Sequence, residues 1–137
     1  MFSKDTDTYA IPGFLANGIY AGIKENVAKD LALIFSVVPS TVAAVFTRNA
    51  FKAAPVLLDM ERIKSGKAQA VLANSGNANA ATGDAGYEDA IAMSRSVSGK
   101  LGISDELILV ASTGIIGHRP PVETVRGRAE ELVSGLH

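Results

Sequence analysis

Two apolar segments that lie close together place the strongest limit on what this chain can fold into. Residues 31–38 (Leu-Ala-Leu-Ile-Phe-Ser-Val-Val) and 42–47 (Val-Ala-Ala-Val-Phe-Thr) are apolar at nearly every position, and only Pro39-Ser40-Thr41 separates them. Two strands joined by so short a connection are typical of a hairpin. Strands without an alternating polar face are typical of a sheet that is covered on both sides. The sequence therefore predicts a hairpin of fully buried strands.

The rest of the chain predicts alternating helices and strands. A helix opening at Pro55 would place Val56, Met60 and Ile63 on one apolar face and end near Gly66. The other elements are recognised by apolar runs or helical spacing: a short strand within 11–24, strands at 68–73 and 107–111, and helices at 87–101 and 121–135. This order predicts an α/β fold, or an α+β fold built in layers.

Composition excludes several functional classes. Thirteen basic and fourteen acidic residues give a net charge of −1, so we expect no nucleic-acid partner, because no basic excess is present to neutralise phosphates. The absence of cysteine excludes disulfides, thiolate metal sites and a cysteine nucleophile. Two histidines without an accompanying carboxylate cluster give no reason to expect a metal.

Neither a membrane segment nor a signal peptide is expected. The most apolar run, residues 31–38, is far shorter than the roughly 20 residues that span a bilayer. Residues 1–5 carry charge with no apolar stretch behind them, unlike a secretory signal. We therefore expect a cytoplasmic protein in which residues 1–137 form one α/β unit.

A polar, glycine-containing segment follows the strand predicted at 68–73. Asn74, Ser75, Gly76, Asn77 and Asn79 offer hydrogen-bond donors and acceptors on a flexible backbone, and they are candidates for shaping a substrate pocket. The alternative is a connection in which asparagine side chains satisfy their own backbone. The residue types alone leave both interpretations open.

A second candidate follows the strand predicted at 107–111. Thr113 carries a hydroxyl and Gly114 a backbone N–H on a flexible residue, and two such donors can stabilise an oxyanion. The alternative is that Ser112 or Thr113 caps a helix. No nucleophile is evident, since the chain has no Gly-x-Ser-x-Gly motif, and Ser112 with His118 lacks a carboxylate to orient the base.

Six segments together resemble a known family. They are 18–24, 30–34, 44–49, 53–56, 74–80 (Asn-Ser-Gly-Asn-Ala-Asn-Ala) with Thr82-Gly83, and 112–117 (Ser-Thr-Gly-Ile-Ile-Gly). On these residues the chain resembles the N-terminal (α) part of the ornithine acetyltransferases of arginine biosynthesis, also called bifunctional glutamate N-acetyltransferases. The resemblance implies a layered α/β fold like that of N-terminal-nucleophile enzymes.

The resemblance also implies an activity and a partner. Such enzymes cut themselves before a threonine, which becomes the N-terminal nucleophile of a β chain in an α2β2 assembly. Acetyl passes from N-acetylornithine through this threonine to glutamate. Thr113 and Gly114 match the family's oxyanion hole, and no metal or redox cofactor is required. The sequence leaves open whether acetyl-CoA also serves as a substrate.

The chain departs from the family pattern in three places. Ala81 replaces an expected cysteine, the segment 118–120 is His-Arg-Pro, and no segment with the nucleophilic threonine follows. We therefore expect the unit to be completed by a β chain. Three alternatives remain: a subunit of an N-terminal-nucleophile aminopeptidase or amidase, a noncatalytic interaction module, and a serine hydrolase that uses Ser112.

Overall fold

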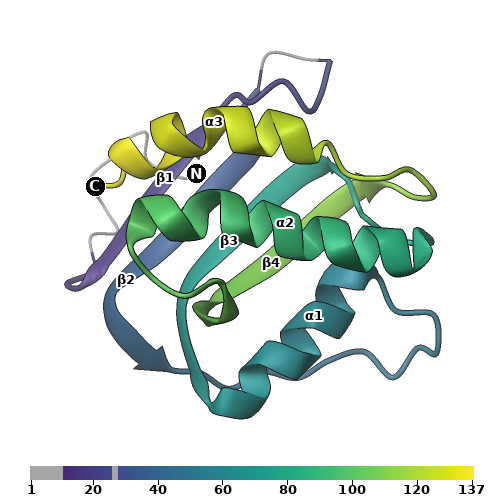
Figure 1. Ribbon diagram of the computed structural model, residues 1–137, viewed down its shortest axis with the longest axis horizontal. Helices are drawn as coiled ribbons and strands as arrows, with labels where there is room; N and C mark the ends of the chain where they lie inside the picture. The colour runs from purple at the N-terminus through teal and green to yellow at the C-terminus, as the bar shows by residue number, and fades with distance from the viewer. Residues whose placement is uncertain (1–10, 26–27) are drawn as a thin grey trace, which may run out of the picture.

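The computed structural model describes residues 11–25 and 28–137, and it has a mixed α/β fold with one four-stranded sheet (Figure 1). Residues 1–5, from which no signal peptide is expected, lie outside the described residues. The elements in chain order are β1 (Phe14–Ile19), β2 (Leu31–Thr41), α1 (Ala54–Arg62), β3 (Lys67–Asn77), α2 (Gly83–Leu101), β4 (Ile108–Ile115) and α3 (Val122–Ser134), with 3-10 turns at Ile63–Ser65 and Asp105–Leu107. The layered α/β fold is therefore confirmed.

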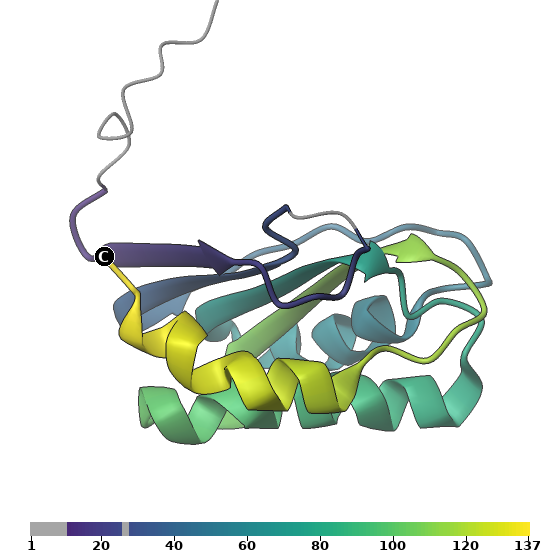
Figure 2. The same ribbon diagram turned by 90° about the horizontal axis from the view of Figure 1, so that it is seen from above.

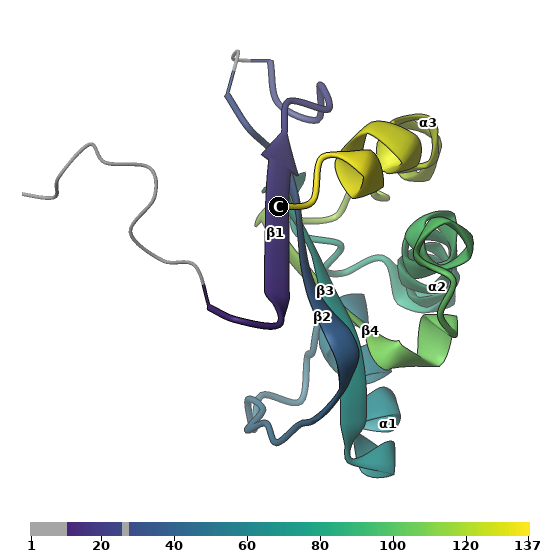
Figure 3. The same cartoon turned by 90° about the vertical axis from the view of Figure 1, so that its left-hand side faces the viewer.

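The strands lie in the order β1-β2-β3-β4. The first two pairings are antiparallel and β3–β4 is parallel. All three helices pack on one face of the sheet (Figure 3). No helix in the described part of the chain is long and apolar enough to cross a bilayer.

The core lies between the sheet and helices α2 and α3, which run side by side beneath it (Figure 2). Leu33 of β2 and Leu72 of β3 contribute from the sheet, and Met93 of α2 and Leu132 of α3 face them; all four are fully buried. Burying a side chain of this size stabilises the fold by roughly 1.5–3 kcal/mol. Helix α1 packs on a smaller cluster that contains Leu58 and Val110.

The opposite face of the sheet is bare in the described residues. Leu33 is fully buried, whereas the next residue, Ile34, is 51% exposed, because successive strand residues point to opposite faces. Phe14, Val37 and Val38 are also exposed. Residues 11–25 and 28–137 therefore do not provide the predicted coverage of both faces, although the apolar composition of β2 suits a face that is covered.

The predicted hairpin at 31–47 is wrong. Residues 36–41 continue β2, and residues 42–47 form no strand. The register against β3 shifts between Phe35 and Ser40, and Ser36 Oγ donates to the carbonyl of Val38 within this bulge. Pro39 has no N–H to give to a ladder, so it is tolerated in a bulge. The bulge replaces the expected turn.

Helix α1 closes the outer edge of β4. The carboxylate of Asp59 accepts a hydrogen bond from the Val110 N–H (3.0 Å), and the Arg62 guanidinium donates to the carbonyl of Ile108. Exposed edge groups invite pairing with other chains, and these two side chains occupy them. The predicted apolar face of this helix is wrong: Met60 is exposed, and Leu58 and Arg62 are buried instead. Arg62 is buried although it is charged, because its guanidinium donates to the Ile108 carbonyl at the edge of the sheet.

The other edge is closed by the end of the chain. Ala16 of β1 donates to the carbonyl of His137 (3.1 Å), and the His137 N–H donates back to Ala16 (3.4 Å). Asn17 Nδ2 donates to the carbonyl of Leu132 at 2.8 Å, which fastens β1 to the last turn of α3. At each edge of the sheet, main-chain groups of the edge strand are therefore occupied by this chain's own residues, at Ala16 on one side and at Ile108 and Val110 on the other.

Asp59 makes stability depend on pH. Burial raises the pKa of Asp59 to about 6, against the opposing effects of the Val110 hydrogen bond and the charge of Arg62. The ordinary value is 3.8, so between about pH 4 and 6 the folded state binds more protons than the unfolded state. Stability contributed by this group is present at low pH and is lost as the pH rises through 6.

We therefore expect Asp59→Asn to remove that loss. Asparagine keeps an acceptor for the Val110 N–H and cannot ionise. The difference in unfolding free energy between variant and parent, measured by denaturant titration, should shift in favour of the variant from pH 4 to pH 7. A difference that stays constant over that range would contradict the buried-carboxyl interpretation.

Candidate functional site

The two predicted site segments lie next to each other. The parallel pairing of β3 with β4 sets Asn74 opposite Ser112, Ser75 opposite Thr113 and Gly76 opposite Gly114. Both strands run further than the sequence predicted, to Asn77 and Ile115, so every candidate residue except Asn79 belongs to a strand end rather than to a loop. The carboxyl ends of the two parallel strands thus bring both motifs to one edge of the sheet (Figure 1).

Gly76 and Gly114 touch backbone to backbone. Their φ angles are +106° and +135°, a region that favours glycine. A Cβ placed on Gly114 would lie 2.5 Å from the Asn77 nitrogen and 2.6 Å from the Gly76 oxygen. No side chain fits between the strands here, and the ladder register shifts at this point. The glycines let the turn at Thr113–Gly114 approach the end of β3 closely.

The helix-cap interpretation of Ser112 and Thr113 is wrong, because both lie within β4 and α3 begins at Val122. Ser112 Oγ instead donates to Asn74 Oδ1 at 2.6 Å, and Asn74 Nδ2 donates to the carbonyl of Asn77 at 2.9 Å. This link crosses from β4 to β3 immediately before the candidate turn. It gives the Ser112 hydroxyl an amide partner rather than a histidine base.

The remaining asparagines hydrogen-bond the backbone around them. Asn77 Nδ2 donates to the carbonyls of His118 (3.0 Å) and Arg119 (3.1 Å). Asn79 is fully buried, and its Nδ2 donates to the carbonyl of Gly86 at 2.8 Å. These contacts favour a role in fixing the shape of the segment. That Asn74, Ser75, Gly76, Asn77 and Asn79 shape a substrate pocket stays a prediction.

The segment after β4 is tied to helix α2. Two nitrogens of Arg119 donate to the two carboxylate oxygens of Asp89, at 2.7 and 2.6 Å. The hydrogen bond and the charge of Asp89 raise the pKa of Arg119. Arg119 is thus paired with a nearly buried carboxylate, while much of its own side chain stays exposed. The pair steadies the backbone that Asn77 binds.

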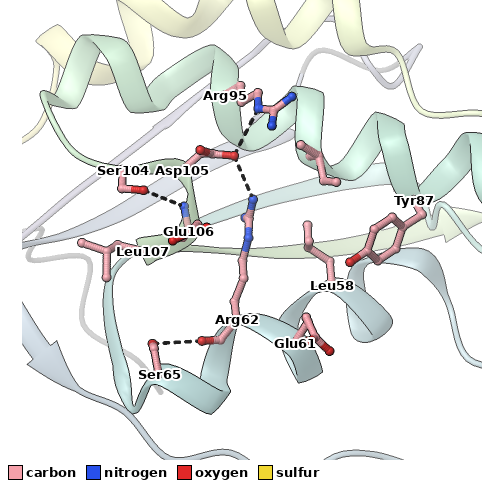
Figure 4. A pocket seen from close by; sticks show the side chains of 11 residues that line it. Leu58, Glu61, Arg62, Ser65, Tyr87, Arg95, Ser104, Asp105, Glu106 and Leu107 are labelled. Carbon is pink, nitrogen blue, oxygen red and sulfur yellow. Dashed lines mark hydrogen bonds and ion pairs between the residues drawn. The ribbon is translucent and has the colours of Figure 1, made fainter.

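A cleft lies away from the candidate residues at the ends of β3 and β4. An open cleft of about 660 Å³ is lined by α1, α2 and the 3-10 turn at Asp105–Leu107 (Figure 4). Arg62 points into its wall and binds Ser94 Oγ (2.9 Å) and Asp105 (3.3 Å), and Asp105 also pairs with Arg95 (3.2 Å). These partners tie the charged groups to one another, so the cleft offers a ligand few unoccupied charges. Within the described residues, no group of three His, Asp or Glu could hold a metal ion.

The site and the fold define a class: layered α/β proteins that expose backbone and hydroxyl donors where two parallel strands end. Residues 15–137 match the ArgJ family, and the chain belongs to that family. The arginine biosynthesis bifunctional protein ArgJ of Caldanaerobacter subterraneus subsp. tengcongensis is 57% identical over 113 residues, which cover 82% of this chain and 28% of the relative. That of Geobacter sulfurreducens is 52% identical over 126 residues, which cover 92% and 32%. The chain thus spans about a third of these relatives.

Two solved structures share the fold. The arginine biosynthesis bifunctional protein ArgJ of Bacillus halodurans superimposes with a TM-score of 0.83 at 39% identity, covering 88% of this chain and 63% of that one. The ornithine acetyltransferase of Mycobacterium tuberculosis, solved in complex with ornithine, gives a TM-score of 0.87 at 41% identity, covering 92% and 68%. The resemblance read from the six sequence segments is confirmed.

Two glycines of helix α2 test the packing of the asparagine segment. A Cβ on Gly86 would lie 2.5 Å from Asn79 Oδ1 and also clash with Thr82, whereas one on Gly99 would meet nothing within 4 Å. We expect Gly86→Ala to destabilise the fold by about 1–3 kcal/mol, as overpacking does. Gly99→Ala, the matched control, should stabilise it by about 0.5–1 kcal/mol through helix propensity. Denaturant unfolding measures both, and equal effects would contradict the close packing described.

Proposed function

We propose that this chain is the part of an ornithine acetyltransferase that supplies the oxyanion hole. The Thr113 hydroxyl and the Gly114 N–H would donate to the carbonyl oxygen of the acetyl group as it becomes negative. Membership of the ArgJ family supports the reaction, and the single observation that carries the assignment is the glycine-to-glycine contact that fixes the turn at Thr113–Gly114.

The proposed reaction is an acyl transfer in two steps. A threonine hydroxyl at the start of a β chain attacks the acetyl carbonyl of N-acetylornithine, the C–N bond breaks, and ornithine leaves with the proton on its amine. The amine of glutamate then attacks the acetyl ester, the C–O bond breaks, and the threonine recovers its proton. Both steps pass through a tetrahedral oxyanion, so one pair of donors serves both. This chemistry requires no metal or redox cofactor.

The exposure of the site supports a partner. Thr113, Gly114 and the following Ile115 and Ile116 are exposed in this chain. An oxyanion hole is effective in a water-excluded site, so the proposal requires further protein to cover the carboxyl ends of β3 and β4. The bare apolar face of the sheet and the fraction of the relatives that the chain spans support the same requirement.

The proposal therefore includes a β chain that completes the unit formed by residues 1–137. Its finer parts are the release of that chain by self-cleavage before its threonine, an α2β2 assembly and action in the cytoplasm. N-acetylornithine and glutamate are the proposed substrates. The relatives carry the word bifunctional in their names, and acetyl-CoA is the proposed second acetyl donor.

Removing the Thr113 hydroxyl should slow catalysis without unfolding the protein. In the complete enzyme, we expect Thr113→Ala to lower kcat about 10²–10³-fold, the usual effect of losing one oxyanion donor. Thr113→Ser, which keeps the hydroxyl, should lose much less. Thr41→Ala is the matched control, because Thr41 is an exposed threonine at the opposite end of the sheet.

The assay follows transfer of acetyl from N-acetylornithine to glutamate. Turnover of Thr113→Ala at the parent rate would remove Thr113 from the site. Hydrolysis of peptide amides by the parent enzyme, with no acetyl transfer, would instead identify an N-terminal-nucleophile aminopeptidase or amidase.

A further inference from the structure

A single buried carboxylate closes the connection between β1 and β2. Asp30 is 3% exposed, and its carboxylate accepts hydrogen bonds from the backbone N–H groups of Ala21 (2.7 Å), Ile23 (2.7 Å) and Lys24 (2.9 Å). Burial raises the pKa of Asp30, but these three bonds and the charge of Lys24 outweigh it and leave the pKa below its ordinary value. The ionised side chain therefore fixes residues 21–24 in one shape.

The backbone of Asp30 fastens the same connection to the end of β3. Its carbonyl accepts the Ser75 N–H at 2.9 Å, and its N–H donates to the carbonyl of Ile19 at 3.0 Å. Residues 21–24 then lie directly over Gly76: a Cβ on Gly76 would be 2.8 Å from Lys24 Cγ and 3.0 Å from Ile23 Cγ2. The connection thus covers the side of Gly76 on which a side chain would stand.

Gly76 is consequently held between two segments. On one side it contacts residues 21–24, and on the other its backbone touches Gly114. Protein interiors are packed too closely to absorb small shifts, so a displacement of one layer is passed to the next. A loosened connection would allow Gly76, and with it the turn at Gly114, to move.

We infer that Asp30 is a positioning residue for the oxyanion hole, acting through residues 21–24 and Gly76 on the direction of the Gly114 N–H. This inference rests on the proposed function. Asp30 does not touch the reacting atoms, and its contribution is geometric. Rates of this kind of chemistry are sensitive to misplacements of about 1 Å, which can cost a hundredfold.

The test is Asp30→Asn in the complete enzyme. The amide has nearly the same shape, but its NH2 group is a donor. It therefore cannot accept the hydrogen bonds that the backbone N–H groups donate to the carboxylate. Rapid-quench measurement of acetyl-enzyme formation from N-acetylornithine gives both an amplitude, which counts active sites, and a rate constant. We expect an unchanged amplitude, a rate constant lower by about tenfold or more, and a substrate KM within about twofold of the parent.

Two controls and a second variant sharpen the result. Asp84→Asn changes an exposed aspartate at the start of α2 and should alter nothing. Gly76→Ala presses on Ile23 and Lys24 from the opposite side and should reproduce the slow rate. Gly66→Ala is its matched control, since Gly66 also has a positive φ (+68°) but no atom within 4 Å of an added Cβ. If Asp30→Asn does not fold, Gly76→Ala decides by the same readout.

The outcomes separate the inference from the proposed function. A parental rate constant in both variants, or an amplitude that falls in proportion to activity, overturns the inference, because the second result means fewer folded sites rather than misaligned ones. Absence of any acetyl-enzyme in the parent overturns the proposed function and the inference with it. A normal amplitude with a slow rate in Asp30→Asn and Gly76→Ala, and not in their controls, supports it.

Discussion

The candidate site depends on one contact, the meeting of Gly76 and Gly114 where the parallel strands β3 and β4 end. A side chain at Gly114 would collide with the backbone of β3, and one at Gly76 would collide with Ile23 and Lys24. Because the strands are parallel, both carboxyl ends reach the same edge, and two motifs almost forty residues apart become neighbours. The geometry of the turn at Thr113–Gly114 follows from this closeness.

Polar side chains around this contact fix the backbone rather than face outward. Asn74 links the two strands, Asn77 donates to the segment after β4, and Asn79 donates to a carbonyl in the first turn of α2. Buried amides with satisfied partners specify one arrangement, because any other would leave polar atoms unpaired. No buried side-chain nitrogen or oxygen of the described residues lacks a partner. The polar side chains around this contact are thus held in one arrangement by this chain's own groups.

Apolar periodicity and motif spacing predicted several helices and strands and the family resemblance from the sequence. The helical stripe at 87–101 and the strand at 68–73 are found, because each buries one side against the same core. The hairpin at 31–47 is not found, since an apolar run alone does not reveal whether a proline lies in a turn or a bulge. The buried positions of Arg62 and Asp30 were also missed. Both are charged, and each binds groups, backbone carbonyls or N–H groups among them, that only the folded chain brings near.

The closure of both sheet edges has a consequence for assembly. At Ile108 and Val110 of β4 and at Ala16 of β1, an added strand would first have to displace this chain's own Arg62, Asp59 and His137. The open apolar face, by contrast, presents side chains rather than main-chain groups to a partner. Binding to such a face depends on the fit of apolar side chains, so it favours a partner of complementary shape. Unpaired strand edges, in contrast, promote indiscriminate pairing.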